Sequence, residues 1–152
     1  MSLNVVQLLK LSARAIKRSP SYLPFYSGTR SFRSSAPRAV VYANADQQTF
    51  NKAVNAKDRV VLVDFYADWC GPCHQLSPII ERLTNEPSTT GASKLPLDLV
   101  KIDTDSDDGQ SLGAKFKISA LPTVIAFRDG EPIAQFVGAL NEARVQRFIN
   151  EL

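Results

Sequence analysis

The chain has 152 residues, of which 44% are hydrophobic. It is therefore long enough for one globular domain and too apolar for a disordered protein. No run reaches the roughly 18 apolar residues of a membrane-spanning helix. Residues 1–39 contain seven Lys or Arg and no acid, whereas residues 40–152 hold 11 bases against 15 acids. The net charge of +3 thus comes from the N-terminal segment, and we expect neither a nucleic-acid nor a membrane partner.

Residues 1–39 have the composition of a targeting segment. They are rich in Arg and Ser, lack acids and place apolar residues at helical spacing, which is typical of a mitochondrial transit peptide. A secretory signal is disfavoured because the apolar stretch 3–9 is short and leads into more bases. A solvated basic tail is the other alternative. Residues 30–35 resemble the Arg-x-Phe-x-x-Ser pattern of matrix presequences cleaved in two steps, which implies a mitochondrial matrix location and a mature chain beginning near Val40.

Residues 40–152 alternate strand and helix patterns. Their order, β-α-β-α-β-α-β-β-α, predicts an α/β fold with a mixed sheet and helices on both faces. Asp129-Gly130 predicts a hairpin turn between the last two strands, and Gly138 ends the second of them. The predicted elements are strands at 40–42, 60–66, 97–102, 122–127 and 132–137, helices at about 46–54, 70–86, 111–116 and 141–152, and an acidic turn at 103–109.

The only two cysteines, Cys70 and Cys73, follow the buried strand 60–66 and open the next helix. They lie too close in sequence to link distant parts of a fold, as a disulfide-rich secreted scaffold requires. A structural zinc site needs four ligands, and only His74 stands nearby, so metal binding is the weaker alternative. At a helix N-terminus, free N–H groups and the macrodipole favour the Cys70 thiolate, which is the nucleophilic form. The pattern therefore predicts a redox site.

The segment Trp69-Cys70-Gly71-Pro72-Cys73 resembles the active-site motif of the thioredoxin family. The resemblance covers residues 40–152 and implies the thioredoxin fold, with a central mixed sheet flanked by helices on both faces. It implies a mitochondrial member of the family, a protein-disulfide reductase that binds no cofactor or metal itself. The other matching positions are Asp64, Lys101, Leu121-Pro122-Thr123, Gly130 and Gly138-Ala139-Leu140.

The resemblance also implies catalytic roles. Cys70 attacks a client disulfide, and Cys73, buried one turn further along the helix, resolves the mixed disulfide. Asp64 interrupts an apolar strand, where burial should raise the pKa of its carboxyl and suit it to general-base work near neutral pH. Lys101 supports Asp64, and the alternative is that the two form a merely structural pair.

A docking surface for clients is implied around the cysteines. Only about one X-Pro bond in twenty is cis, but the resemblance implies a cis Leu121–Pro122 bond beside them. That loop would pair with an extended client segment, a form of strand addition. The implied substrate-binding residues are Trp69, Gly71, Pro72, Leu121, Pro122, Gly138 and Ala139.

The implied partners are an NADPH-dependent thioredoxin reductase, which recharges the dithiol, and disulfide-containing clients such as peroxiredoxins; we expect a monomer. A disulfide isomerase or oxidase is the first alternative, and the Gly-Pro dipeptide and the leader argue against it. A binding scaffold that acts irrespective of redox state is the second, and the intact cysteines argue against it. His74 stands where many relatives carry Lys or Arg, and loops 85–96 and 103–112 are longer than is usual in the family.

Overall fold

The computed structural model describes residues 39–86 and 91–152, so most of the predicted presequence lies outside the described residues. The predicted β-α-β-α-β-α-β-β-α order is confirmed. The elements are β1 (Val41–Tyr42), α1 (Gln47–Val54), β2 (Val60–Tyr66), α2 (Gly71–Asn85), β3 (Leu97–Asp103), α3 (Asp107–Lys115), β4 (Thr123–Arg128), β5 (Glu131–Val137) and α4 (Glu142–Asn150).

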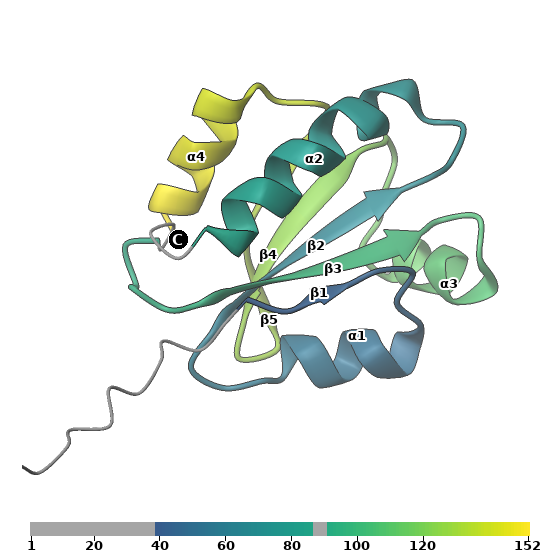
Figure 1. The fold of residues 1–152 in the computed structure, drawn as a ribbon. Helices are drawn as coiled ribbons and strands as arrows, with labels where there is room; N and C mark the ends of the chain where they lie inside the picture. The colour runs from purple at the N-terminus through teal and green to yellow at the C-terminus, as the bar shows by residue number, and fades with distance from the viewer. Residues whose placement is uncertain (1–38, 87–90) are drawn as a thin grey trace, which may run out of the picture. The chain divides into compact units, whose positions relative to one another are not determined.

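The strands form one mixed sheet in the order β1-β3-β2-β4-β5. The central strand β2 runs parallel to β3 and antiparallel to β4, and β5 is the antiparallel partner of β4. Helices α2 and α4 cover one face of this sheet, and α1 and α3 cover the other (Figure 1). The predicted fold class is therefore confirmed, and β2 is shielded on both faces and along both edges.

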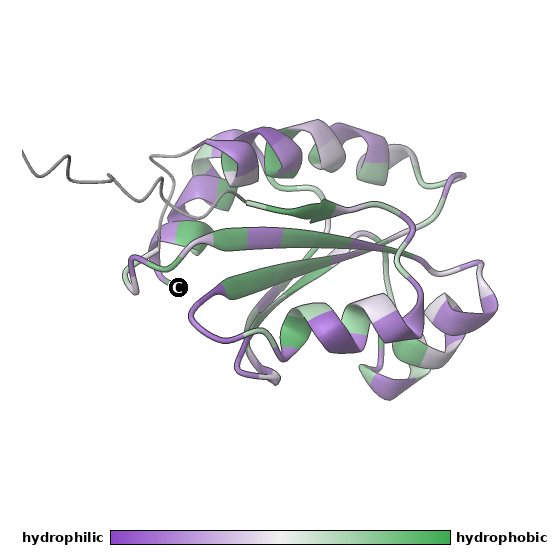
Figure 2. Ribbon diagram, turned by 60° about the horizontal axis from the view of Figure 1, so that its bottom comes forward, coloured by the Kyte–Doolittle hydropathy of each residue, from purple (hydrophilic) through white to green (hydrophobic). Residues whose placement is uncertain are grey.

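The two faces of the sheet have different cores. On the α1/α3 face, aromatic rings pack with neighbouring centroids 5.3–6.2 Å apart; the rings are those of Phe50, Phe65, Phe116 and Phe127. The α2/α4 face is mainly aliphatic, with Leu62, Leu76 and Ile80 in contact. The strands are largely hydrophobic, whereas the helices carry both hydrophobic and hydrophilic residues (Figure 2). Since side chains alternate along a strand, Asp64 lies on the same face as Leu62, beneath α2.

The predicted hairpin turn is confirmed. Asp129 and Gly130 have φ values of 54° and 90°, as a two-residue turn with both central residues in the left-handed region requires. The Gly130 N–H donates to the Val54 carbonyl oxygen at 2.8 Å, which ties the turn to the end of α1. Gly138, with φ 88°, follows the last residue of β5, as expected.

The start of α3 differs from the prediction. The sequence predicts a turn at 103–109 and a helix from Ser111, but the helix begins at Asp107. Ser106 is its N-cap, and the hydroxyl oxygen accepts the Gly109 N–H at 3.0 Å. Asp107 and Asp108 then lie in the first turn, where the helix macrodipole stabilises carboxylates. The acids that indicated a turn are signals of a helix start.

Candidate active site

The cysteine pair lies where β2 passes into α2. Cys70 is the N-cap of α2, with an extended backbone, and its Sγ accepts the Cys73 N–H at 3.2 Å. Pro72 lies in the first turn of the helix, where its missing N–H costs no intrahelical hydrogen bond. The sequence of the motif thus places one sulfur at the N-terminus of the helix and the other one turn along it.

The two cysteines form a disulfide, with their Cα atoms 5.3 Å apart. Each residue is 4% exposed. Ala67 completes their buried cluster, and Tyr66 and Leu121 pack against it. Gly71 and Pro72 are exposed beside it, so the pair lies just beneath the surface, in apolar surroundings.

Asp64 is buried beneath α2, with 1% of its surface exposed. Burial raises the pKa of this carboxyl to about 6, with an opposing contribution from Lys101 and a smaller raising contribution from Glu81. The expected rise in pKa is therefore confirmed. Within residues 39–86 and 91–152, its Oδ1 has no hydrogen-bond partner. A carboxyl in this state accepts a proton near neutral pH.

Lys101 neighbours Asp64 in the sheet register, but its ammonium group bonds elsewhere. Its Nζ donates to Ser77 Oγ at 2.6 Å and to Glu81 Oε1 at 2.8 Å, both on α2. Among the described residues, no ion pair joins Lys101 to Asp64. Lys101 thus acts on Asp64 through space, without a direct ion pair.

The loop before β4 reaches the disulfide from a distant part of the sequence. The Leu121–Pro122 bond is cis, as the resemblance implied, and Leu121 packs against the cysteine cluster. The Pro122 carbonyl oxygen accepts the Gly138 N–H at 2.8 Å, so the end of β5 is joined to the same loop, and the exposed Ala139 follows it. Three of the predicted docking segments are thereby brought together.

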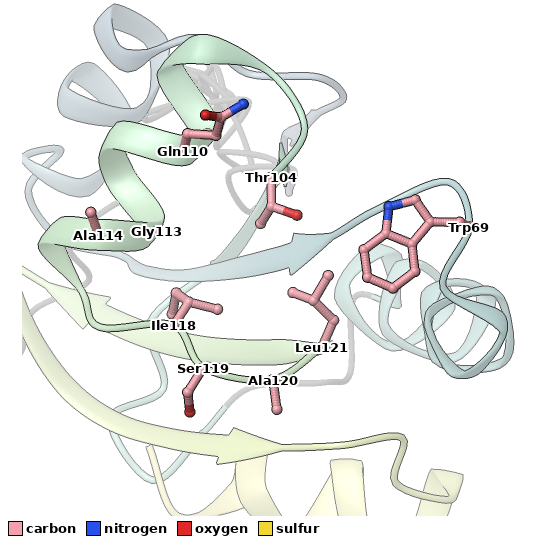
Figure 3. Close-up of a pocket in the computed structure, with 10 residues that line it drawn as sticks. Trp69, Thr104, Gln110, Gly113, Ala114, Ile118, Ser119, Ala120 and Leu121 are labelled. Carbon is pink, nitrogen blue, oxygen red and sulfur yellow. The ribbon is translucent and has the colours of Figure 1, made fainter.

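A hollow of about 350 Å³ opens between Trp69, α3 and the loop before β4. Trp69 is 73% exposed, and its indole N–H donates to Asp105 Oδ2 at 2.9 Å. Leu121 and Trp69 both line this hollow (Figure 3). Sequence reasoning missed the lining residues from α3, although Gln110 and Gly113 stand at i and i+3 and so share a helix face.

His74, the other candidate metal ligand, lies on the surface beside the cysteines. Its side chain is exposed, and its Nε2 lies 2.8 Å from the Asp68 carbonyl oxygen. In the described part of the chain, no group of three or more His, Cys, Asp or Glu residues is arranged to hold a metal ion. No helix in that part is long and apolar enough to cross a membrane.

Sequence comparisons agree with this geometry. The family model described as Thioredoxin matches residues 41–151. The chain is 41% identical to thioredoxin Y1, chloroplastic, of Arabidopsis thaliana over 117 residues, 76% of this chain; the match spans 63% of that relative, less than two thirds of its length. It is 30% identical to thioredoxin, mitochondrial, of Bos taurus over 147 residues, with 93% of this chain and 83% of the relative covered.

A solved structure gives the same result. A mutant thioredoxin from Halobacterium salinarum NRC-1 superposes with a TM-score of 0.60 at 32% identity, with 76% of this chain and 92% of that chain covered. The family match and the paired cysteines support protein-disulfide reductase activity. The chain therefore belongs to the thioredoxin family and carries the redox-active cysteine pair of a thiol–disulfide oxidoreductase.

Proposed function

We propose that this protein reduces disulfides of other proteins in the mitochondrial matrix and is recharged by an NADPH-dependent thioredoxin reductase. The observation that carries the proposal is the Cys70–Cys73 disulfide at the start of α2, beneath an exposed surface and six residues after the buried Asp64. Reduction of this disulfide makes two thiols available, one at the helix N-terminus and one inside the first turn.

In the first step, Cys70 attacks as a thiolate. The Cys73 N–H, 3.2 Å from its Sγ, and the positive end of the helix dipole favour the anion. A bond forms between Cys70 and one client sulfur, the client disulfide breaks, and the second client sulfur leaves as a thiolate that takes a proton from water. The product is a mixed disulfide.

In the second step, Cys73 resolves the mixed disulfide. Asp64 takes the Cys73 thiol proton, directly or through a water molecule, and the resulting thiolate attacks the Cys70 sulfur. The Cys70–client bond breaks, and the client sulfur leaves as a thiolate that takes up the proton held by Asp64, directly or through water. The client has then gained two electrons and two protons, and the Cys70–Cys73 disulfide has re-formed. Thioredoxin reductase restores the dithiol with two electrons from NADPH.

Clients dock on the surface around the disulfide as extended segments that pair with the loop before β4. Disulfide-containing proteins such as peroxiredoxins are the proposed clients, and the protein acts as a monomer without a bound cofactor or metal. Support comes from the contact of Leu121 with the cysteine cluster and from the exposure of Trp69. The proposed docking residues are Trp69, Gly71, Pro72, Leu121, Pro122, Gly138 and Ala139.

The domain boundary is proposed near Val40, with a transit peptide at 1–39 and the thioredoxin domain at 40–152. Val40 is bonded to β3 on both sides: its N–H donates to Asp98 Oδ1 and its carbonyl oxygen accepts the Leu99 N–H, each at 2.9 Å. A mitochondrial relative supports the location, whereas a chloroplastic relative favours a plastid. Imaging of the tagged full chain distinguishes the two organelles, and N-terminal sequencing of the organellar protein should give a start near Val40.

The activity is tested by NADPH-coupled insulin reduction with a mitochondrial thioredoxin reductase. We expect turnover for the unsubstituted chain, none for Cys70→Ser, and a trapped mixed disulfide for Cys73→Ser.

Asp64→Asn should slow resolution by about 100-fold at neutral pH, while the first step changes little. A dithiol potential of about −180 mV would assign the protein to the disulfide isomerases instead. Full biological activity of a chain with both cysteines replaced by Ser would identify a binding scaffold.

A further inference from the structure

Two charged residues of the sheet, Asp64 and Lys101, lie next to each other beneath α2, but in the part of the chain that the structure describes only Lys101 has polar partners on the helix. Lys101 stands beside Asp64 in the register of β2 and β3, and residues paired in this way point to the same face of the sheet. Its ammonium group is nevertheless held by the helix, through Ser77 Oγ and Glu81 Oε1. It also lies 5.2 Å from the centroid of the Tyr66 ring. Lys101 is the cation that lowers the pKa of Asp64, and its ammonium group makes these three contacts with other residues.

The same arrangement leaves the Asp64 carboxyl without a direct ion pair among the described residues. Its Oδ1 has no hydrogen-bond partner in the described part of the chain. Its register neighbour on β4 is the uncharged Val124. The charged groups acting on it are Lys101 from β3 and Glu81 from α2. A lysine has a flexible four-carbon stem, so the position of its ammonium group depends on which acceptors hold it.

We propose that Glu81, assisted by Ser77, is a positioning residue for the resolving step, because it holds the Lys101 ammonium on α2 and so keeps it from pairing with Asp64. The proposal rests on the proposed role of Asp64 as the base for Cys73. Glu81 touches neither the client nor the cysteines in this scheme. It acts through Lys101, and thereby keeps Asp64 a proton acceptor suited to neutral pH.

The direction of the effect follows from the charges. An ammonium group that moved from Glu81 to Asp64 would stabilise the carboxylate and lower its pKa. Asp64 would then be ionised at lower pH but would be a weaker base towards the Cys73 thiol. Loss of the Glu81 charge also removes a repulsion that favours the protonated form of Asp64. Both changes have the same sign.

Titration of the Asp64 carboxyl carbon, followed by NMR in the oxidised full-length chain, tests the inference without any enzymatic assay. Glu81→Gln should move the midpoint to lower pH by about one unit or more. Ser77→Ala removes one of the two hydrogen bonds and should give a smaller shift in the same direction. Glu86→Gln, which removes a carboxylate at the C-cap of the same helix, is the matched control and should leave the midpoint unchanged.

A second pair of variants separates positioning from simple repulsion. In a chain that carries Lys101→Met, Glu81→Gln should shift the Asp64 midpoint by much less than it does when Lys101 is present. An equal shift in both backgrounds would mean that Glu81 acts by direct repulsion, and would overturn the proposal. An unchanged midpoint in the Glu81→Gln chain would overturn it as well, as would an equal shift in the Glu86→Gln control.

The kinetic consequence is measured with an aryl disulfide that releases one chromophoric thiolate in each step. Glu81→Gln should move the pH profile of the second release to lower pH and leave the first release unchanged. A merely structural role for Glu81 would not move this profile. If Asp64→Asn left the second release unchanged at every pH, the proposed role of Asp64 would fail, and the NMR midpoints would still decide whether Glu81 positions Lys101.

Discussion

Two aspartates in neighbouring strands are buried to the same extent but differ in their hydrogen-bond partners. Asp64 on β2 and Asp98 on β3 are each 1% exposed. Asp98 accepts hydrogen bonds from the Arg59 guanidinium at Oδ2 and from the Val40 N–H at Oδ1. Among the described residues Asp64 has no such partner at Oδ1, and the pKa of its carboxyl is raised to about 6 by burial. One carboxyl is partnered at both oxygens, and the other is kept ready to take up a proton.

The contrast separates a structural acid from the acid that we propose as the base. A buried carboxylate that is paired and hydrogen-bonded can remain ionised without a large penalty, but removal of its partner is costly. A buried carboxyl without partners destabilises the fold whenever it is ionised. Because such a group lowers stability, its presence 6 residues before Cys70 favours a role in the chemistry of the site.

The largest effect is expected at the partnered acid. Asp98→Ala leaves the Arg59 guanidinium, with 21% of its side chain exposed, and the Val40 N–H without their acceptor. The free energy of unfolding should fall by about 3 kcal/mol, as measured by urea denaturation at neutral pH. The double change Arg59→Met with Asp98→Leu, which removes the whole pair, should recover most of this loss. An equal loss in both variants would contradict the pairing.

A slightly smaller effect of opposite sign is expected for Asp64→Asn. The folded-state pKa of about 6 lies above the ordinary value of 3.8. Ionisation of Asp64 therefore lowers the stability of the fold as pH rises between these two values, and the stability changes little at higher pH. The stability of Asp64→Asn relative to the unsubstituted chain should therefore increase by about 2 kcal/mol between about pH 4 and pH 7. Urea denaturation across this range measures it. A pH-independent difference would mean that the acid is not held protonated.

The smallest effect is expected when the charge at Arg59 is kept and only the shape of its head group is changed. Arg59→Lys keeps the charge near Asp98 but replaces a planar guanidinium with a compact, strongly hydrated ammonium. We expect a loss of about 1 kcal/mol in the free energy of unfolding, measured alongside Asp98→Ala under the same conditions. A loss as large as that of Asp98→Ala would show that the shape of the guanidinium, more than its charge, supports the carboxylate.

The sequence predicts the surroundings of Asp64 much better than those of Asp98. The first interrupts a strand of Val, Leu and Phe, so its burial and raised pKa follow from local pattern alone. For Asp98 the local pattern indicates only a place in a strand, because its partner Arg59 is 39 residues away. A signal is present all the same: Arg59 and Asp98 stand at the starts of two parallel strands, which meet at one end of a sheet.

Long-range placement also explains the other differences. The contacts of Lys101 with Ser77 and Glu81 join β3 to α2, and no periodicity in the sequence specifies which acceptor a lysine will choose. The cis Leu121–Pro122 bond follows from family resemblance, since local preference alone favours trans. The early start of α3 depends on the Ser106 cap, a local signal that the run of acids outweighs in the sequence pattern.

The hydrogen bond from Val40 to Asp98 would give the proposed cleavage near Val40 a physical consequence. While Ala39 precedes it, Val40 offers this carboxylate a neutral amide N–H. A cut between Ala39 and Val40 would put an α-ammonium group at the same nitrogen, beside a buried anion. Charge-assisted hydrogen bonds are roughly twice as strong as neutral ones. Cleavage at this bond would thus strengthen the attachment of the edge strand β1 to β3 by a charge-assisted hydrogen bond. The uncleaved chain would have only the neutral hydrogen bond at this position.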